Sequence, residues 1–401
     1  MTNNIREAER STPVTKTYDT VVAGGGIAGI SAALAAARNG AKTLLIEREF
    51  MFGGLATLGL VTIYLPLCDG MGRQVSFGIA EELLRLSVKH GYDGKFCPEW
   101  LGDGTLEDRR KKRFEVQYNP YIFAIETEQL LIKAGVDILY GTLVCDAITE
   151  NGKITHLIIE NKSGRSAIEV RNVVDTTGDA DICKLSGEST VKFKQGNVPA
   201  SWYYSADSGK NNLSPLGFCD IPDSQKTREH IEADKSSLRF TGLDSDELTS
   251  LMIYSHKSLL NDFLKKGDES PERALSSIAA IPQIRMTRRI DGVYTQDDCE
   301  IHREYCDSVG LFSDWRKPGP VYELPFCALY GKKIKNLITA GRSISVTDSM
   351  WDITRVIPVC AVSGQAAGTA AATTENFADT DINKLQTILK NAGVVLHEKD
   401  L

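Results

Sequence analysis

The sequence contains no apolar run that approaches the roughly 20 residues needed to cross a bilayer. The stretch from Met1 to Lys16 is polar and has no apolar signal-peptide core. We therefore expect residues 1–17 to form a flexible tail on a cytoplasmic protein that is not integral to a membrane. The chain also has no excess of positive charge, with 46 Lys and Arg against 53 Asp and Glu. Because nucleic acids and anionic membranes attract a basic surface, we expect neither as a partner.

The nine cysteines are scattered, and no C-x-x-C pair occurs among them. This pattern supports neither a disulfide framework nor a zinc ribbon, and it gives no basis for disulfide reductase chemistry. Cys299, His302 and Cys306 are near each other in sequence but offer only three soft ligands. We therefore expect reduced thiols and no metal site.

The composition is that of an ordinary globular protein, with 42% hydrophobic and 25% charged residues. A chain of 401 residues predicts two or three domains, or one large α/β domain with an insertion. Apolar runs at residues 18–23 and 42–46 flank an alanine-rich helical stretch at residues 28–38. Strand, glycine turn, helix and strand together predict a βαβ unit at the start of the domain.

The turn inside this unit reads Gly24-x-Gly26-x-x-Gly29. The first glycine permits a tight turn, the second lets the backbone approach a pyrophosphate, and the third lets the helix pack close to the strand. The helix N-terminus then offers free N–H groups to phosphate. Glu47 ends the second strand and supplies the acid expected for the ribose hydroxyls. An acid at this position favours FAD or NAD over NADP.

Eight segments of the chain carry a resemblance to a known family. They are Val21–Gly29, Glu47–Arg48, Gly53–Thr57, Asp175–Asp181, Ile281–Ile290, Asn336–Ser345, Arg355–Pro358 and Gly364–Gly368. With these segments the chain resembles the FAD-dependent oxidoreductases of the glutathione-reductase-type fold, and within them the broad family called FAD-dependent oxidoreductase. The resemblance covers the first 60 and last 80 residues well and the middle in patches.

This resemblance implies a doubly wound, Rossmann-type α/β domain that binds FAD and is assembled from separated segments. We expect the FAD-binding domain at residues 18–66, 120–189 and 321–401, and an α+β cap or substrate domain at 67–119 and 190–320. The cofactor contacts that we expect are Gly24, Gly26, Ile27, Ala28, Gly29, Glu47, Arg48, Gly53, Gly54, Leu55, Ala56, Val144, Thr177, Gly178, Asp179, Gly341, Arg342, Pro358, Gly364, Ala366 and Ala367.

Two further absences narrow the class of flavoprotein. No second G-x-G-x-x-G follows a later strand, so we expect no separate domain for NAD(P)H. No His-Thr segment of the kind that tethers flavin in fumarate reductases precedes Gly53-Gly54. We therefore expect the FAD to be held without a covalent bond.

The candidate catalytic residues are Arg285, Arg355 and His302. An arginine offers a fixed fork of donors to a carboxylate, and a histidine exchanges a proton near neutral pH. The segment around Trp351, from Asp348 to Asp352, is a further candidate for substrate contact. For each of these residues a purely structural role, as an ion pair or a surface side chain, stays open.

The sequence thus predicts an enzyme that transfers a hydride between non-covalent FAD and a small polar organic molecule, with an anionic substrate among the options. Two alternatives stay open. One is a reductase of C=C bonds, as the fumarate reductases are. The other is a non-redox flavoprotein scaffold or a subunit that needs an electron-transfer partner. A homo-oligomer is also compatible with the sequence.

Overall fold

The computed structural model describes the whole chain except residues 1–4, 6–8, 102–103, 112–114, 218–221, 234–235 and 268–271. Parts of the expected tail and of the expected cap segments therefore lie outside the described residues. Strand β1 (Val14–Ala23) begins four residues before the strand predicted at Tyr18. Its first residues are strand because they pair in parallel with β8 (Gly164–Asp175), from Val14 beside Ala167 onward.

A seven-stranded sheet forms the centre of the described structure. Its order is β5-β2-β1-β8-β7-β6, and β16 pairs with β8 beside this path. Strands β5, β2, β1, β8 and β16 run parallel, whereas β7 and β6 continue the sheet antiparallel. The remaining bounds are β2 Thr43–Ile46, β5 Asp137–Leu139, β6 Leu143–Glu150, β7 Lys153–Asn161 and β16 Leu337–Thr339.

Strand β8 is one continuous strand of 12 residues. From Ala167 to Asp175 it pairs with β1 on one edge. On the other edge, residues 164–169 pair with β7 and residues 173–175 pair with β16. Along this one edge of β8, the neighbouring strand is therefore antiparallel at first (β7) and parallel afterwards (β16). It also brings the chain near residue 340 back beside the first βαβ unit.

Alternation along the buried strands separates two cores, one on each face of the sheet. Val22 and Leu45 point to the larger core, and their neighbours Val21 and Leu44 point to the smaller one. Helices α1 (Ile27–Arg38), α9 (Ile357–Thr373), α4 (Pro120–Lys133) and α2 (Ile79–Val88) contribute to the larger core. Helix α5 (Asp181–Ser186) covers the other face.

Small residues let α1 and α9 pack with their backbones close together. A Cβ atom on Gly364 of α9 would lie 2.3 Å from the carbonyl oxygen of Ala28, and one on Gly368 would lie 2.0 Å from that of Ala32. Both contacts are shorter than any real Cβ contact, so glycine is required at both positions. The alanine-rich texture of the two helices is therefore a packing feature.

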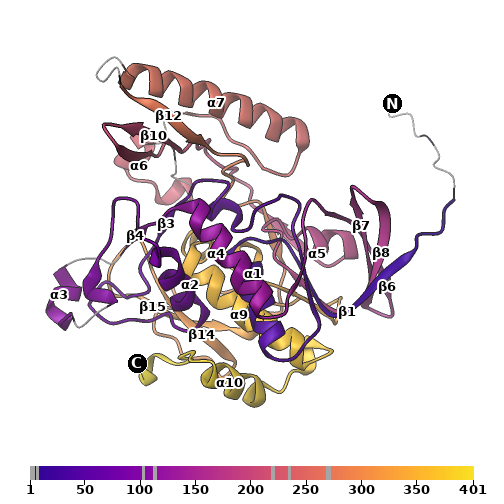
Figure 1. Cartoon of the computed structure of the whole chain (residues 1–401). Helices are drawn as coiled ribbons and strands as arrows, with labels where there is room; N and C mark the ends of the chain where they lie inside the picture. Colours follow the sequence, from indigo (N-terminus) through magenta and orange to yellow (C-terminus); the bar gives the residue numbers. More distant parts are fainter. Residues whose placement is uncertain are drawn as a thin grey trace.

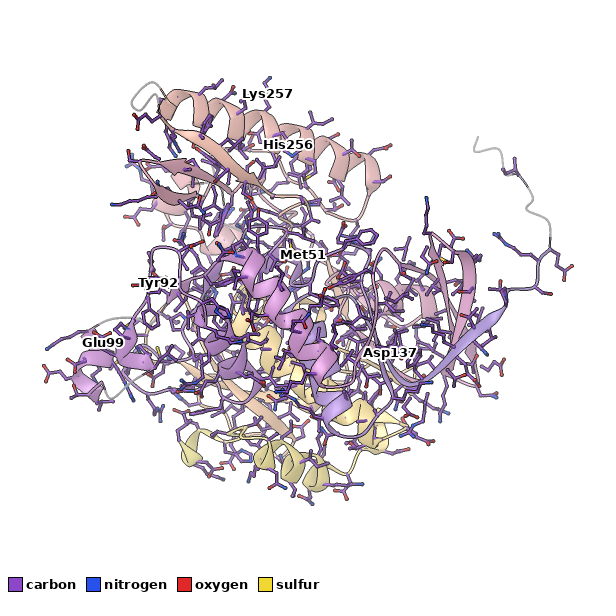
Figure 2. The ribbon with its side chains drawn as sticks, in the orientation of Figure 1. Met51, Tyr92, Glu99, Asp137, His256 and Lys257 are labelled. Carbon is purple, nitrogen blue, oxygen red and sulfur yellow. The ribbon has the colours of Figure 1, made fainter. Side chains whose placement is uncertain are left out.

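A separate lobe rises above the main body in Figure 1. It contains the antiparallel sheet β11-β10-β12 and the long helix α7, which His256 and Lys257 mark at the top of Figure 2. Asp137 of β5 marks the main body in the same view, where its carboxylate accepts a hydrogen bond from Tyr18. The bounds in the lobe are β10 Tyr203–Asp207, β11 Lys210–Ser214, α6 Arg228–Ala233, α7 Ser245–Gly267 and β12 Ala274–Ile278.

The segment 67–119, which we expected in the cap, contributes to the main body instead. Its helix α2 shares the larger core through Leu83 and Leu84. Near residue 320 the expected boundary also falls within a paired hairpin, because β14 (Ser308–Ser313) pairs with β15 (Val321–Pro325).

The remaining helices and strands are β3 Ile63–Tyr64, α3 Leu106–Lys111, β4 Val116–Gln117, β9 Thr190–Lys192, β13 Arg288–Ile290, α8 Asp348–Thr354 and α10 Ile382–Asn391.

Among the described residues, no single helix has the length and apolar character to cross a membrane. Helices α8 and α9 meet that standard only as a pair, and they are bent by 91° where they meet.

Candidate functional site

A cavity of about 470 Å³ opens at the carboxyl ends of the parallel strands. Ala23 ends β1 and Ile46 ends β2, while Thr176 follows β8 and Ala340 follows β16; all four line the cavity. In open α/β sheets, ligands bind at this edge of the strands. The cavity therefore lies where the topology of the sheet predicts a binding site.

The glycine turn borders the cavity, and its three glycines have different surroundings. Gly24 adopts a φ of +104°, and a Cβ there would lie 2.5 Å from the carbonyl oxygen of Thr176. A Cβ on Gly29 would lie 1.8 Å from the carbonyl oxygen of Gly24. Gly26 differs, because a Cβ there would meet nothing within 4 Å. Gly24 and Gly29 are thus required for packing, whereas Gly26 leaves space in the cavity itself.

The N-terminus of α1 meets this space. Its N-cap residue is Gly26, which supplies no side-chain hydrogen bond to the first turn, and the first turn contains no acidic residue. Gly53 closes the other side of the turn: its N–H donates to the carbonyl oxygen of Gly25 at 2.8 Å, and its φ is +106°. Backbone N–H groups and the positive end of the helix dipole together suit a phosphate.

Glu47 lies at the end of β2 and is buried. Its Oε2 accepts a hydrogen bond from the N–H of Gly25 at 2.6 Å, and its Oε1 accepts one from the N–H of Glu49 at 2.9 Å. Burial raises the pKa of Glu47, while these two backbone hydrogen bonds act in the opposite direction. A carboxylate has about four acceptor positions, so this one retains capacity for the hydroxyl groups of a ligand.

Arg342 connects three segments at the far side of the cavity. Its Nε donates to the carbonyl oxygen of Gly178 at 2.6 Å, and its Nη1 donates to that of Ile284 at 2.6 Å. Its Nη2 forms an ion pair with Asp179 at 2.7 Å. All three guanidinium nitrogens therefore bind protein, and the residue holds the cavity wall together.

The predicted catalytic residues separate into two groups. Arg285 and Arg355 line the cavity. His302 does not, and its Nδ1 instead pairs with Glu398 at 2.7 Å near the C-terminus. The candidate segment around Trp351 is helix α8, and Trp351 is fully buried with its Nε1 donating to the carbonyl oxygen of Arg342. Its place in the structure is thus behind the cavity wall.

Most of the expected cofactor contacts line the cavity, and they come from six separated segments. Those that line it are Gly24, Gly26, Ile27, Ala28, Glu47, Arg48, Gly53, Gly54, Leu55, Ala56, Val144, Thr177, Gly178, Gly341 and Arg342. Those that do not are Gly29, Asp179, Pro358, Gly364, Ala366 and Ala367. The second group acts through packing and ion pairs, as Gly364 does against α1.

Sequence reasoning missed several residues of the cavity wall. They include Ile63, Leu65, Asp181, Trp315 and Cys360. The sequence could have indicated Asp181, since it lies two residues after Asp179 in the Asp175–Asp181 segment. The others carry no motif, and only the folded chain brings them to the cavity.

Comparison with known proteins gives the family. Residues 19–201 and 202–389 match the family described as FAD dependent oxidoreductase. The chain belongs to this family. The prediction of an enzyme that uses FAD is thereby confirmed, as is the α/β fold class.

Curated relatives of this FAD dependent oxidoreductase are moderately similar. It is 32% identical over 250 residues to a thioredoxin reductase of Ureaplasma parvum serovar 3, covering 56% of this chain and 76% of that protein. It is 31% identical over 211 residues to a thiamine thiazole synthase of Methanococcus vannielii, covering 49% of this chain and 69% of that protein.

Among solved structures, this FAD dependent oxidoreductase is similar to a geranylgeranyl bacteriochlorophyll reductase-like protein from Thermoplasma acidophilum. The two are 15% identical with a TM-score of 0.44, and the match covers 94% of this chain and 82% of that one.

The residues of the cavity fit FAD. The space beside Gly26, the uncapped N-terminus of α1 and the remaining acceptor capacity of Glu47 correspond to a pyrophosphate and a ribose. The same cavity is also lined by Gly341, Cys360 and Trp202. A dinucleotide as long as FAD needs such an extended, multi-segment site.

Proposed function

We propose that this enzyme transfers a hydride between non-covalently bound FAD and a small organic substrate with a polar, anionic group. FAD supplies the hydride chemistry when bound, and the protein positions the substrate and its charge. The observation that carries the proposal is the continuity of the cavity. One cavity is lined both by the glycine cradle at Gly24 and Gly26 and by the arginines Arg285 and Arg355.

The cavity wall supports a non-covalent cofactor. Its described lining contains no histidine and no tyrosine, and its one cysteine is Cys360. Burial raises the pKa of Cys360 to about 12, and the thiol donates to the carbonyl oxygen of Arg355 at 3.3 Å. The thiolate is the nucleophile, so this neutral thiol is poorly suited to attack a flavin ring. We expect acid precipitation to release all flavin into the supernatant.

Reduction of thioredoxin, which the name of the Ureaplasma relative specifies for that protein, is not the activity that we propose for this chain. Redox-active disulfide reductases commonly use a pair of nearby cysteines with lowered pKa. This chain contains no C-x-x-C pair, and the described cysteine in the cavity has a raised pKa.

An anaerobic titration tests the proposal. The flavin spectrum of the purified protein is recorded while hydroxy acids, amines, sugars and NAD(P)H are added in turn. We expect an organic substrate with an anionic group to bleach the oxidised flavin, or to reoxidise the flavin after dithionite reduction. A yellow protein whose flavin exchanges electrons with none of these compounds would favour the scaffold or partner-dependent alternative.

A further inference from the structure

The part of the cavity beyond the cofactor cradle is mostly apolar. The lining residues next to the lobe, those just after the Gly53-Gly54 turn, and Trp315 between β14 and β15 share this character. They are Val61, Ile63, Leu65, Trp202, Pro215, Ile281, Pro282 and Trp315. Apolar walls of this kind favour a ligand with an apolar body.

Most charged side chains around this region are already paired with protein groups. Glu115 forms an ion pair with Lys95, and Arg342 forms one with Asp179. Arg285 is 4% exposed, and its Nη2 donates to the carbonyl oxygen of Gly217 at 3.4 Å. A ligand with several charges would therefore find few partners here.

Arg355 is different because it is paired on one edge only. Its Nε and Nη2 both donate to Oδ1 of Asp352, at 3.1 and 2.5 Å. A guanidinium group has five N–H donors and two edges that suit a carboxylate. Asp352 occupies the edge between Nε and Nη2. In the described part of the chain, the edge between Nη1 and Nη2 has no hydrogen-bond partner.

Asp352 also orients the ring next to this arginine. Its carbonyl oxygen accepts a hydrogen bond from Nε1 of Trp315 at 2.9 Å, and Trp315 lines the same cavity. Asp352 itself is fully buried, and Arg316 lies 3.8 Å from its Oδ2. One buried residue thus fixes both an arginine edge and an indole ring at the cavity wall.

We propose that this site takes a monocarboxylate with an apolar body. The carboxylate would bind both nitrogens of the Nη1–Nη2 edge of Arg355, and the body would pack against Trp315 and the apolar wall. This inference rests on the proposed function, because it names the substrate class of the same site. Asp352 acts in it as a positioning residue.

Calorimetric titration of the FAD-loaded protein tests this inference without turnover. The probes are benzoate, acetate, succinate and benzyl alcohol. We expect benzoate to bind at least about tenfold more tightly than acetate, because only benzoate buries a ring. Succinate should bind no better than acetate, since it adds a charge and no ring. Succinate binding as tightly as benzoate would overturn the proposal.

Arg355→Lys tests the role of the arginine edge. The lysine keeps the charge but loses the fork, so we expect benzoate affinity to fall about tenfold or more. The affinity for benzyl alcohol, which has no carboxylate, should stay the same. Asp352→Asn is a second variant that should also weaken benzoate binding, because the guanidinium loses its ionic anchor. Unchanged benzoate affinity in both variants would overturn the proposal.

The chain offers a matched control for this substitution. Arg85 of α2 donates through Nε and Nη2 to one oxygen of Glu81, at 2.8 and 2.7 Å, but it does not line the cavity. We expect Arg85→Lys to bind benzoate as the unsubstituted protein does. The flavin spectrum of each variant shows whether the cofactor site is intact. Benzoate binding by a protein whose flavin exchanges electrons with no organic compound would support this site and contradict only the proposed hydride transfer.

Discussion

Gly368 of α9 lies directly against the backbone of Ala32 in α1, where a Cβ atom would be 2.0 Å from the alanine carbonyl oxygen. The neighbour is backbone and not a flexible side chain. The contact therefore sets the distance between the two helices. Since Ile27 and Ala28 in the first turn of α1 line the cavity, this packing also positions the cavity wall.

Gly368→Ala is therefore expected to destabilise the fold by about 1–3 kcal/mol, as overpacked cores are. Thermal unfolding of the FAD-loaded protein measures the effect as a lowered midpoint. Ala372→Ser, on a half-exposed position of the same helix, serves as the control and should change the midpoint little. Equal midpoints for both variants would contradict the packing argument.

Gly26→Ala should weaken FAD binding without lowering the stability of the fold. The position has an extended backbone with φ of −68°, and the added Cβ meets no protein atom within 4 Å. We expect the unfolding midpoint of the FAD-free protein to stay the same. The methyl group enters the cofactor cradle, so FAD affinity should fall about tenfold or more, measured by flavin fluorescence. Retained affinity would place the pyrophosphate elsewhere.

Arg342→Ala removes the residue that connects Gly178, Asp179 and Ile284. The substitution leaves Asp179 without its ion-pair partner and two carbonyl oxygens without their donors. We expect a loss of about 2–4 kcal/mol in the free energy of unfolding and a loss of bound FAD. Urea unfolding and the flavin content of the purified protein measure these two effects. Arg165→Ala, which removes a more exposed arginine paired with Glu160, is the control.

Asp181 predicts a pH dependence of stability. Burial, with the nearby carboxylates of Asp179 and Asp175, raises the pKa of Asp181 from 3.8 to about 6, although Arg288 acts in the opposite direction. The folded state therefore holds this proton more tightly than the unfolded state does. The contribution of Asp181 to stability is fully present below about pH 4 and is lost as the pH rises through about 6.

Comparison with Asp181→Asn isolates this effect, because asparagine does not titrate. The free energy of unfolding of the natural protein, relative to that of the variant, should fall between pH 4 and pH 6.5 and then level off. Urea unfolding at constant FAD concentration across this range measures the difference. A difference that rises with pH would contradict a raised pKa for Asp181 in the folded state.

Local patterns made the first βαβ unit and its place at the cavity predictable. The pattern consists of the strand at residues 18–23, the glycines from Gly24 to Gly29 and the acid at Glu47, which are close in sequence. The residue type at each position indicates its role, such as a tight turn, close packing or an acceptor of hydrogen bonds. Gly341 and the segment Gly364–Gly368 carry the same kind of local signal. Contacts between residues far apart in the chain have no such local pattern in the sequence.

His302 shows the limit of residue-type arguments, because its partner Glu398 is 96 positions away in the chain. The segment after residue 348 shows another limit. Its sequence suggests a loop near the substrate, but the core buries Trp351, and the segment folds as α8. The apolar wall of the cavity includes Trp315 and Ile63, which are far apart in the chain. No short sequence pattern marks these residues, because only the fold brings them together.

Strand β16 joins the sheet only through residues 337–339, and the cavity wall is completed by Gly341, Arg342 and Cys360. The first βαβ unit, by contrast, is complete by residue 46. The glycine turn is therefore made long before the residues that complete the cavity wall. We therefore expect tight flavin binding only once the segment through Cys360 has been made and β16 has joined the sheet.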